Sequence, residues 1–252
     1  MFSKSIEKYV NSLKQKKYRI AENCFIAEGE KIAGELLASD YTVRKIIATA
    51  EWLHTNQSMF GKKNPDLCQV TEREMKRISA LTQPSAVMLV AEIPPATWAE
   101  STVNNQLSLV LEDIRDPGNL GTIIRIADWF GITYIFCSGE TVDAYNPKVI
   151  QSSMGSICRV QVVEMPLANL FQRFPELPVY ATALEGESIY SAALTRNGFI
   201  VIGNEARGIS SQVKPYVTRV LTIPGSGRAE SLNAAVAAGI VCAMFRKPQV
   251  LP

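Results

Sequence analysis

The sequence of 252 residues contains a single histidine, His54, in the polar stretch EWLHTNQSMFGKKNPD. We expect this residue to lie in a surface loop and not at a catalytic centre. One histidine leaves little scope for Ser-His-Asp or Cys-His catalysis, or for a metal site built on histidines. Any proton transfer must therefore use another kind of side chain.

Cysteine is also scarce, and its five positions are scattered along the chain. No two of them form a C-x-x-C pair, so the sequence indicates neither a zinc site nor a disulfide framework, and no metal is expected. No apolar run approaches the ~18 residues of a membrane span. The first twenty residues lack the apolar core of a signal peptide. We therefore expect no membrane partner and a cytoplasmic location.

The net charge is only +2, but the positive charge is concentrated near the N-terminus. The basic residues among the first twenty are Lys4, Lys8, Lys14, Lys16, Lys17 and Arg19, and Glu7 is the one acidic residue there. A clustered basic face is typical of a protein that binds a polyanion. A solvated helix face explains the same charges equally well, so charge alone leaves both interpretations open.

The stretch EIPPATWAESTVNNQ, with two adjacent prolines and a polar tail, is typical of a linker. It predicts a small domain over residues 1–95, a linker over 96–106 and a larger domain over 107–252. In the small domain we expect a basic helix over residues 3–16 and a strand followed by a helix in FIAEGEKIAGELLAS. TVRKIIAT and AVMLVAEI are typical of strands. TEREMKRISAL predicts a helix that begins with a capping box of Thr71 and Glu74.

The larger domain alternates strongly between apolar strands and helices. The expected strands are LSLVLED, TYIFCS, RVQVVEM, PVYATAL, GFIVIGNE and RVLTIPG, and the expected helices are NLGTIIRIADWFG, NPKVIQSSMG, PLANLFQRF and SLNAAVAAGIVCAMFR. Continuous apolar runs indicate strands that are covered on both faces. The alternation predicts an α/β fold with a parallel, doubly wound sheet. Ligands of such sheets bind beyond the carboxyl ends of the strands.

The first polar turn at a strand end lies in LEDIRDPGNLGTIIRIADWFGI. Asn119 and Arg125 are six residues apart, near the turn side of the helix that follows. A purely structural explanation is available, in which Asp116 or Asn119 caps the helix and Arg125 pairs with an acid such as Asp128. On this stretch alone the structural explanation is the stronger one.

The second turn, in FIVIGNEARGIS, follows a buried strand, and glycine there allows a ligand to approach the backbone. The third, in IPGSGRAESLNAAVAAGI, leads into a small, apolar helix. Its pattern G-x-G-x-x-E lacks the third glycine of the dinucleotide fingerprint, and no Lys-Ser or Lys-Thr follows. Ser231 is either an N-cap or a ligand-binding group. We therefore expect the three turns to converge on one edge of the sheet. Their residues suit a ligand that is held by backbone groups and a reaction that needs little acid–base catalysis.

These three stretches resemble, in order and spacing, the three motifs of the SpoU (TrmH-type) branch of the SPOUT RNA 2′-O-methyltransferases, over roughly residues 107–246. The segment around FIAEGEKIAGELLAS looks like the L30e-like substrate-binding domain found ahead of many such enzymes. The resemblance implies a deep trefoil knot, S-adenosylmethionine as cofactor, an RNA substrate and a homodimer formed through the catalytic domain. It also implies that the Gly225-Ser226-Gly227 loop holds the cofactor by its backbone.

The resemblance assigns roles residue by residue. The catalytic set implied is Asn119, Arg125, Glu205, Ser231 and Asn233. The cofactor-binding set is Leu184, Gly203, Asn204, Gly208, Ile223 and Leu232. The RNA-binding set is Lys14, Lys16, Lys17, Arg19 and Arg115. The resemblance implies that Arg125 acts as the base that removes the hydroxyl proton. Because a guanidinium normally stays protonated, Arg125 could equally stabilise the developing alkoxide or bind the adjacent phosphate.

The L30e-like segment favours ribosomal RNA of the 23S type over transfer RNA as the substrate. Three alternatives stay open: a transfer-RNA 2′-O-methyltransferase, a non-catalytic RNA-binding or ribosome-assembly protein, and a nicotinamide-dependent enzyme. The intact catalytic set argues against the second, and the missing third glycine argues against the last. The nucleotide that is methylated does not follow from the sequence.

Overall fold

The computed structural model describes residues 2–60 and 64–247, and the chain divides into two compact units. The first contains residues 1–95 together with 143–158, and the second contains residues 96–142 and 159–252. Residues 143–158 therefore belong with the N-terminal unit, although in the sequence they fall between two strands of the second unit's sheet. Within the described ranges, every helix falls short of the length and apolarity that crossing a bilayer requires.

The first unit is built on a four-stranded sheet with the order β1-β4-β2-β3. Its strands are β1 (Cys24–Glu28), β2 (Val43–Thr49), β3 (Asp66–Val70) and β4 (Val87–Glu92), and its helices are α1 (Lys4–Ser12), α2 (Lys16–Glu22), α3 (Glu30–Ala38), α4 (Ala50–Thr55), α5 (Glu72–Ile78) and α8 (Pro147–Ser153). The predicted strand and helix after residue 23 are confirmed, as is the capping box of Thr71 and Glu74. β3 and α4 were not expected from the sequence.

Two predictions for this unit are wrong in detail. The basic helix expected over residues 3–16 ends at Ser12, and the extended backbone of Gln15 separates it from a second helix that begins at Lys16. His54 is exposed, as expected, but it lies in the last turn of α4 and not in a loop.

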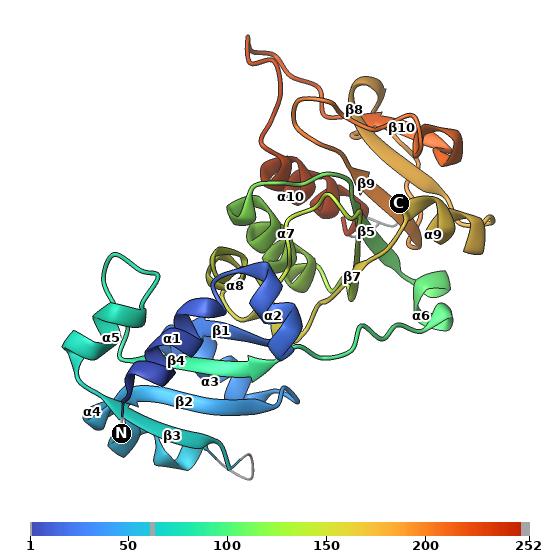
Figure 1. The fold of residues 1–252 in the computed structure, drawn as a ribbon. Helices are drawn as coiled ribbons and strands as arrows, with labels where there is room; N and C mark the ends of the chain where they lie inside the picture. Colours follow the sequence, from blue (N-terminus) through green and yellow to red (C-terminus); the bar gives the residue numbers. More distant parts are fainter. Residues whose placement is uncertain (1, 61–63, 248–252) are drawn as a thin grey trace. The chain divides into compact units, whose positions relative to one another are not determined.

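The second unit is a six-stranded sheet with the order β10-β8-β9-β5-β6-β7, in which every neighbouring pair is parallel (Figure 1). The strands are β5 (Leu107–Leu111), β6 (Tyr134–Cys137), β7 (Gln161–Glu164), β8 (Val179–Ser188), β9 (Gly198–Ile202) and β10 (Arg219–Thr222). All residues of β5, β6 and β9 are buried, which confirms that both faces of the central sheet are covered.

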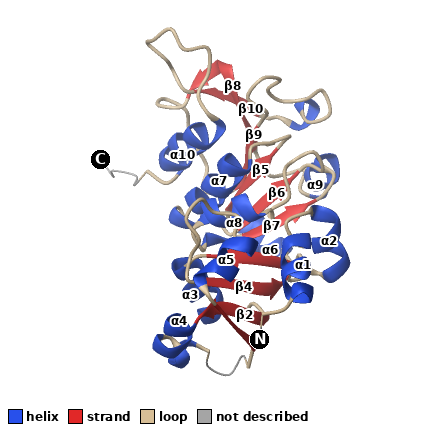
Figure 2. Ribbon diagram, turned by 60° about the vertical axis from the view of Figure 1, so that its left-hand side comes forward, coloured by secondary structure: helices blue, strands red, loops and turns tan. Residues whose placement is uncertain are grey.

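Helices cover both faces of this sheet, so the doubly wound α/β prediction is confirmed. α7 (Pro117–Trp129) and α10 (Ala234–Phe245) lie side by side on one face, and α6 (Glu100–Asn105) and α9 (Leu167–Arg173) lie on the other (Figures 1 and 2). α6 occupies part of the stretch that the sequence presented as a linker. The trefoil knot stays a prediction from the resemblance.

Candidate active site

The turns after β5 and β9 meet at one edge of the second unit's sheet. β5 and β9 are parallel neighbours, with Leu111 paired to Ile202 at their carboxyl ends. From this pair the chain diverges: β5 leads to β6 on one side, whereas β9 leads towards β10 on the other. Such a point of reversal is where open parallel sheets bind their ligands. The fold therefore places two of the three predicted turns at the expected ligand edge.

Three residues predicted as catalytic form one chain of side-chain hydrogen bonds. The Asn119 amide nitrogen donates to Glu205 Oε1 at 2.7 Å, and the Asn233 amide nitrogen donates to Asn119 Oδ1 at 2.8 Å. Asn119 lies in α7, Glu205 in the turn after β9, and Asn233 ahead of α10. These bonds join parts of the chain that are 86 and 114 residues from Asn119 in sequence. The three predicted motifs therefore converge on one side chain, Asn119.

Helix capping explains how two of these asparagines are positioned. Asp116 is the N-cap of α7 and accepts the Asn119 backbone N–H at 2.8 Å, with Pro117 as the first helical residue. Asn233 is the N-cap of α10, and its Oδ1 accepts the N–H groups of Ala235 and Val236. The alternative that Ser231 caps this helix is therefore wrong, because the helix begins three residues after Ser231.

The other two predicted catalytic residues, Arg125 and Ser231, do not take part in this series of hydrogen bonds. Both are exposed, and neither side chain forms a hydrogen bond or ion pair with another residue in the part of the chain that the structure describes. The suggested pairing of Arg125 with Asp128 is not formed, since Asp128 receives the guanidinium of Arg159 at 2.9–3.1 Å. Arg125 thus presents an unneutralised guanidinium to solvent on α7.

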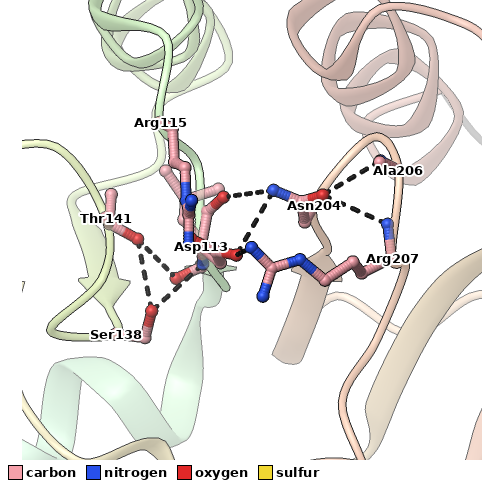
Figure 3. A network of polar contacts seen from close by, with 8 residues as sticks. Asp113, Arg115, Ser138, Thr141, Asn204, Ala206 and Arg207 are labelled. Atoms are coloured by element: carbon pink, nitrogen blue, oxygen red, sulfur yellow. Dashed lines mark hydrogen bonds and ion pairs between the residues drawn. The ribbon is translucent and has the colours of Figure 1, made fainter.

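Asn204 holds the turn after β9 in shape. Its side-chain oxygen accepts the N–H groups of Ala206 and Arg207 (Figure 3), and its backbone oxygen accepts the N–H of Gly208 at 2.8 Å. Its amide nitrogen donates to the backbone oxygen of Asp113 at 2.9 Å. Every polar group of the side chain is thereby engaged within the protein, so Asn204 positions the turn more directly than it binds a ligand.

The same turn depends on the absence of a side chain at Gly203. A Cβ atom there would lie 2.6 Å from the backbone oxygen of Gly208, closer than real Cβ contacts allow. Gly208 has a φ of +64°, a left-handed conformation that favours glycine. The two predicted glycines are therefore required for the tight shape of the turn.

Acidic residues at the end of β5 anchor this turn, and sequence reasoning missed them. Glu112 is buried and accepts the backbone N–H and the hydroxyl of Ser210. Asp113 has a φ of +57°, and its backbone N–H donates to Ser138 Oγ at 3.0 Å (Figure 3). The available signal was an aspartate directly after an apolar strand, since Asp tolerates this conformation better than most residues.

The predicted cofactor-binding residue Leu184 lies within β8, in its exposed second half, whereas Ile223 directly follows β10 and Leu232 lies in the loop ahead of α10. The side chain of Leu184 is 73% exposed and that of Leu232 is 44% exposed. The Thr222 hydroxyl donates to the Leu184 backbone oxygen at 2.8 Å and so links β10 to this part of β8. Apart from Pro224, which has no N–H, residues 223–232 donate no backbone hydrogen bond to another residue in the described ranges. This edge thus offers apolar cover together with available backbone donors.

Thiol nucleophiles do not contribute at this edge. Cys137 ends β6 and Cys242 lies within α10, and both are buried. Desolvation raises the pKa of Cys242 to about 12, and it raises the pKa of Cys137 as well. Both thiols therefore stay protonated near neutral pH and are poor nucleophiles. The polar groups that are available are amides, a hydroxyl, a carboxylate and guanidinium groups.

The predicted RNA-binding residues have very different surroundings. Lys16 and Lys17 are exposed, and Arg115 is exposed next to the candidate site, where the hydrogen bond with Asp113 raises the pKa of its guanidinium. Lys14 is half-buried and donates to the backbone oxygen of Ser79. Arg19 is only 2% exposed, so the prediction that it binds RNA is corrected: its guanidinium donates to Asp143 and to the Leu13 backbone oxygen.

Comparison with known proteins identifies relatives along the whole chain. Residues 106–243 match the SpoU rRNA Methylase family, and residues 5–89 match the MRM3-like substrate binding domain. The chain is 31% identical over 237 residues to the 23S rRNA (guanosine(2553)-2′-O)-methyltransferase RlmP of Bacillus subtilis, covering 91% of both chains.

Solved structures agree with this assignment. A TrmH-family protein from Porphyromonas gingivalis is 36% identical, with a TM-score of 0.84 over 98% of both chains. The rRNA methyltransferase from Sinorhizobium meliloti with bound AdoMet is 26% identical, with a TM-score of 0.87 over 100% of this chain and 98% of that one. The resemblance seen in the three sequence motifs is confirmed, and the chain belongs to the SpoU rRNA Methylase family.

Proposed function

We propose that this protein is an S-adenosylmethionine-dependent RNA 2′-O-ribose methyltransferase that acts on ribosomal RNA of the 23S type. The observation that carries the proposal is the hydrogen-bonded chain of Glu205, Asn119 and Asn233, which joins all three motifs at the ligand edge of the sheet. The name of the Bacillus subtilis relative, a 23S rRNA 2′-O-methyltransferase, supports the substrate class. The match of residues 5–89 to a substrate-binding domain supports a separate RNA-binding unit.

The residues at the strand ends fit S-adenosylmethionine. An adenosine needs apolar cover and backbone hydrogen bonds, and this edge provides Leu184, Ile223 and Leu232 beside the available N–H groups of residues 223–232. The carboxylate of Glu205 supplies a negative charge that complements a cationic sulfonium. When bound, the cofactor supplies an electrophilic methyl group, so the protein has only to align the ribose hydroxyl and stabilise the charge that develops on it.

Arg125 is the group that we assign to the ribose. A guanidinium stays protonated in proteins, so it is better suited to stabilising a developing alkoxide and an adjacent phosphate than to removing a proton. Its side chain is exposed and has no acidic partner among the residues that the structure describes, so the positive charge is available to substrate. Asn119 orients the sugar, and Ser231 and Asn233 hold the nucleotide and the loop ahead of α10.

A methyl-transfer assay with the full chain tests the proposal. Incubation with tritiated S-adenosylmethionine and protein-free rRNA is expected to label the RNA in an alkali-resistant, ribose-methylated dinucleotide. Equal amounts of transfer RNA serve as the comparison substrate, and calorimetry compares S-adenosylhomocysteine with NAD as ligand. Label in transfer RNA alone would overturn the substrate class, and binding of NAD without S-adenosylhomocysteine would overturn the function.

Gly203→Ala is expected to lower affinity for S-adenosylhomocysteine at least about tenfold, because the new Cβ meets the Gly208 backbone oxygen and displaces the turn. Titration calorimetry measures the affinity. Gly139→Ala is the matched control in the same unit, since its Cβ would meet only Glu164 Oε1 at 3.8 Å, an ordinary contact. Unchanged affinity in Gly203→Ala would show that this turn does not shape the cofactor site.

We also propose that the protein forms a homodimer through α7 and α10. α10 carries no charged residue, and its exposed or half-exposed positions include Val236, Ile240 and Ala243. Trp129, at the end of α7, is 84% exposed. Exposed apolar surface of this kind is typical of a protein interface. Sedimentation equilibrium is expected to give twice the chain mass, and a monomeric mass at micromolar concentration would contradict the dimer.

A reducing, cytoplasmic setting is part of the same proposal. The cysteines all lie in the described part of the chain, and no disulfide joins any two of them. Cytosolic proteins keep their thiols reduced, and rRNA is found in that compartment.

A further inference from the structure

One carboxylate beside the candidate site holds two exposed arginines. Arg115 Nε donates to Asp113 Oδ1 at 2.6 Å, and Arg207 approaches Asp113 Oδ2 at 3.4 Å from the opposite side (Figure 3). The side chain of Asp113 is only 13% exposed, whereas those of Arg115 and Arg207 are 60% and 66% exposed. The carboxylate is therefore fixed in the protein, and both guanidinium groups face solvent.

The position of Asp113 is fixed by bonds that do not involve either arginine. Its backbone N–H donates to Ser138 Oγ, and its backbone oxygen accepts the Asn204 amide. Ser138 is within 3.4 Å of Thr141, whose hydroxyl donates to the backbone oxygen of Leu111. Asp113 is thus attached to both turns of the ligand edge. It can hold a side chain from each turn in one place.

The two arginines are close in sequence to the residues assigned to the reaction. Arg115 precedes Asn119 by four residues in the turn after β5, and Arg207 follows Glu205 by two residues in the turn after β9. Asp113 neutralises one of the two guanidinium charges. Both guanidinium groups are exposed, so an incoming anion can reach their outer N–H groups.

We propose that Arg115 and Arg207, oriented by Asp113, form a clamp for a phosphodiester group of the RNA substrate. A guanidinium group binds a phosphate through two parallel N–H···O hydrogen bonds. Two guanidinium groups that are held by one carboxylate therefore present a preformed set of donors. Arg207 is then a substrate-binding residue and Asp113 is a positioning residue. The clamp rests on the proposed function, because it places the RNA backbone beside the ribose that is methylated.

Arg207→Ala in the full chain tests the clamp. The KM for rRNA is expected to rise about three- to tenfold at 100 mM salt, with kcat and the affinity for S-adenosylhomocysteine unchanged. The slope of log Kd against log salt concentration is expected to become shallower by about 0.7–0.9, the range for one lost phosphate contact on a single strand or a duplex. Arg196→Ala is the matched control: Arg196 is exposed in the same unit, but it lies ahead of β9, at the opposite end of that strand.

A double-mutant cycle tests the role of Asp113. Asp113→Asn keeps a residue that accepts the left-handed backbone, and it removes the charge that orients both arginines. Its effect on KM is expected to be smaller in the Arg207→Ala background than in the wild-type protein, since one of its two targets is then absent. Additive effects would overturn the positioning role of Asp113, and an unchanged salt slope in Arg207→Ala would overturn the clamp.

The outcomes separate failure of the clamp from failure of the proposed function. Wild-type protein that methylates rRNA, with variants that behave like Arg196→Ala, rejects the clamp alone. Wild-type protein that binds S-adenosylhomocysteine but transfers no methyl group to RNA rejects the function. In that case, a shallower salt dependence of RNA binding in Arg207→Ala would still support the phosphate contact, in a protein that binds RNA without methylating it.

Discussion

Arg125→Ala is expected to lower kcat for methyl transfer at least about 10³-fold, because it removes the charge that stabilises the developing alkoxide. Cofactor affinity is expected to stay within about twofold of the wild-type value, because the exposed side chain of Arg125 forms no hydrogen bond or ion pair with the predicted cofactor-binding residues Leu184, Ile223 and Leu232. Rapid-quench transfer under saturating S-adenosylmethionine measures kcat, and calorimetry with S-adenosylhomocysteine measures binding.

Two further variants make this result specific. Arg125→Lys keeps the charge but loses the planar pair of donors, so partial activity is expected. Thr122→Ala alters another exposed residue of α7, whose hydroxyl donates to the backbone oxygen of Gly118 in the same helix, and it is expected to leave kcat near wild type. Wild-type turnover in Arg125→Ala would refute its role, and equal loss in Thr122→Ala would point to damage of the helix instead.

Arg19→Ala is expected to destabilise the N-terminal unit by about 3 kcal/mol, because it leaves the carboxylate of Asp143 without its partner in a largely buried site. The bond from Arg19 to the Leu13 backbone oxygen is lost as well. We expect the melting temperature of that unit to fall by about 13 °C, because a unit of about 110 residues has a small unfolding entropy. Differential scanning calorimetry in the presence of S-adenosylhomocysteine, which stabilises the second unit, separates the two transitions.

Lys16→Ala is the control for Arg19→Ala, because Lys16 is an exposed cation in the same helix. It is expected to change the melting temperature little and to weaken RNA binding if the basic N-terminal face contacts RNA. The double variant Arg19→Ala with Asp143→Ala is expected to recover part of the stability, since no buried charge is then left alone. A stable Arg19→Ala protein with weakened RNA binding would restore Arg19 to the RNA-binding set.

Local sequence pattern was sufficient for the architecture of the second unit. Large apolar residues make up most of β5 and β9, and this composition predicts strands covered on both faces. Ser108, the polar residue of β5, is buried. Polar turns at the ends of parallel strands must lie at the same edge, so the meeting of Asn119 with Glu205 follows from topology. The linkage of Asn233 to them agrees with the order and spacing of the three motifs.

Partners across long sequence separations could not be obtained in this way. Arg19 was grouped with surface cations because its neighbours in sequence are lysines, yet Asp143, which pairs with it, lies 124 residues away. The same holds for Asp113, whose role depends on contacts with Ser138, Asn204 and Arg207, all distant in sequence. The choice of Asn233 over Ser231 as the N-cap of α10 depends on the path of the loop ahead of that helix. Strand and helix patterns reflect burial averaged over a face, whereas the environment of one charge depends on which distant group packs against it.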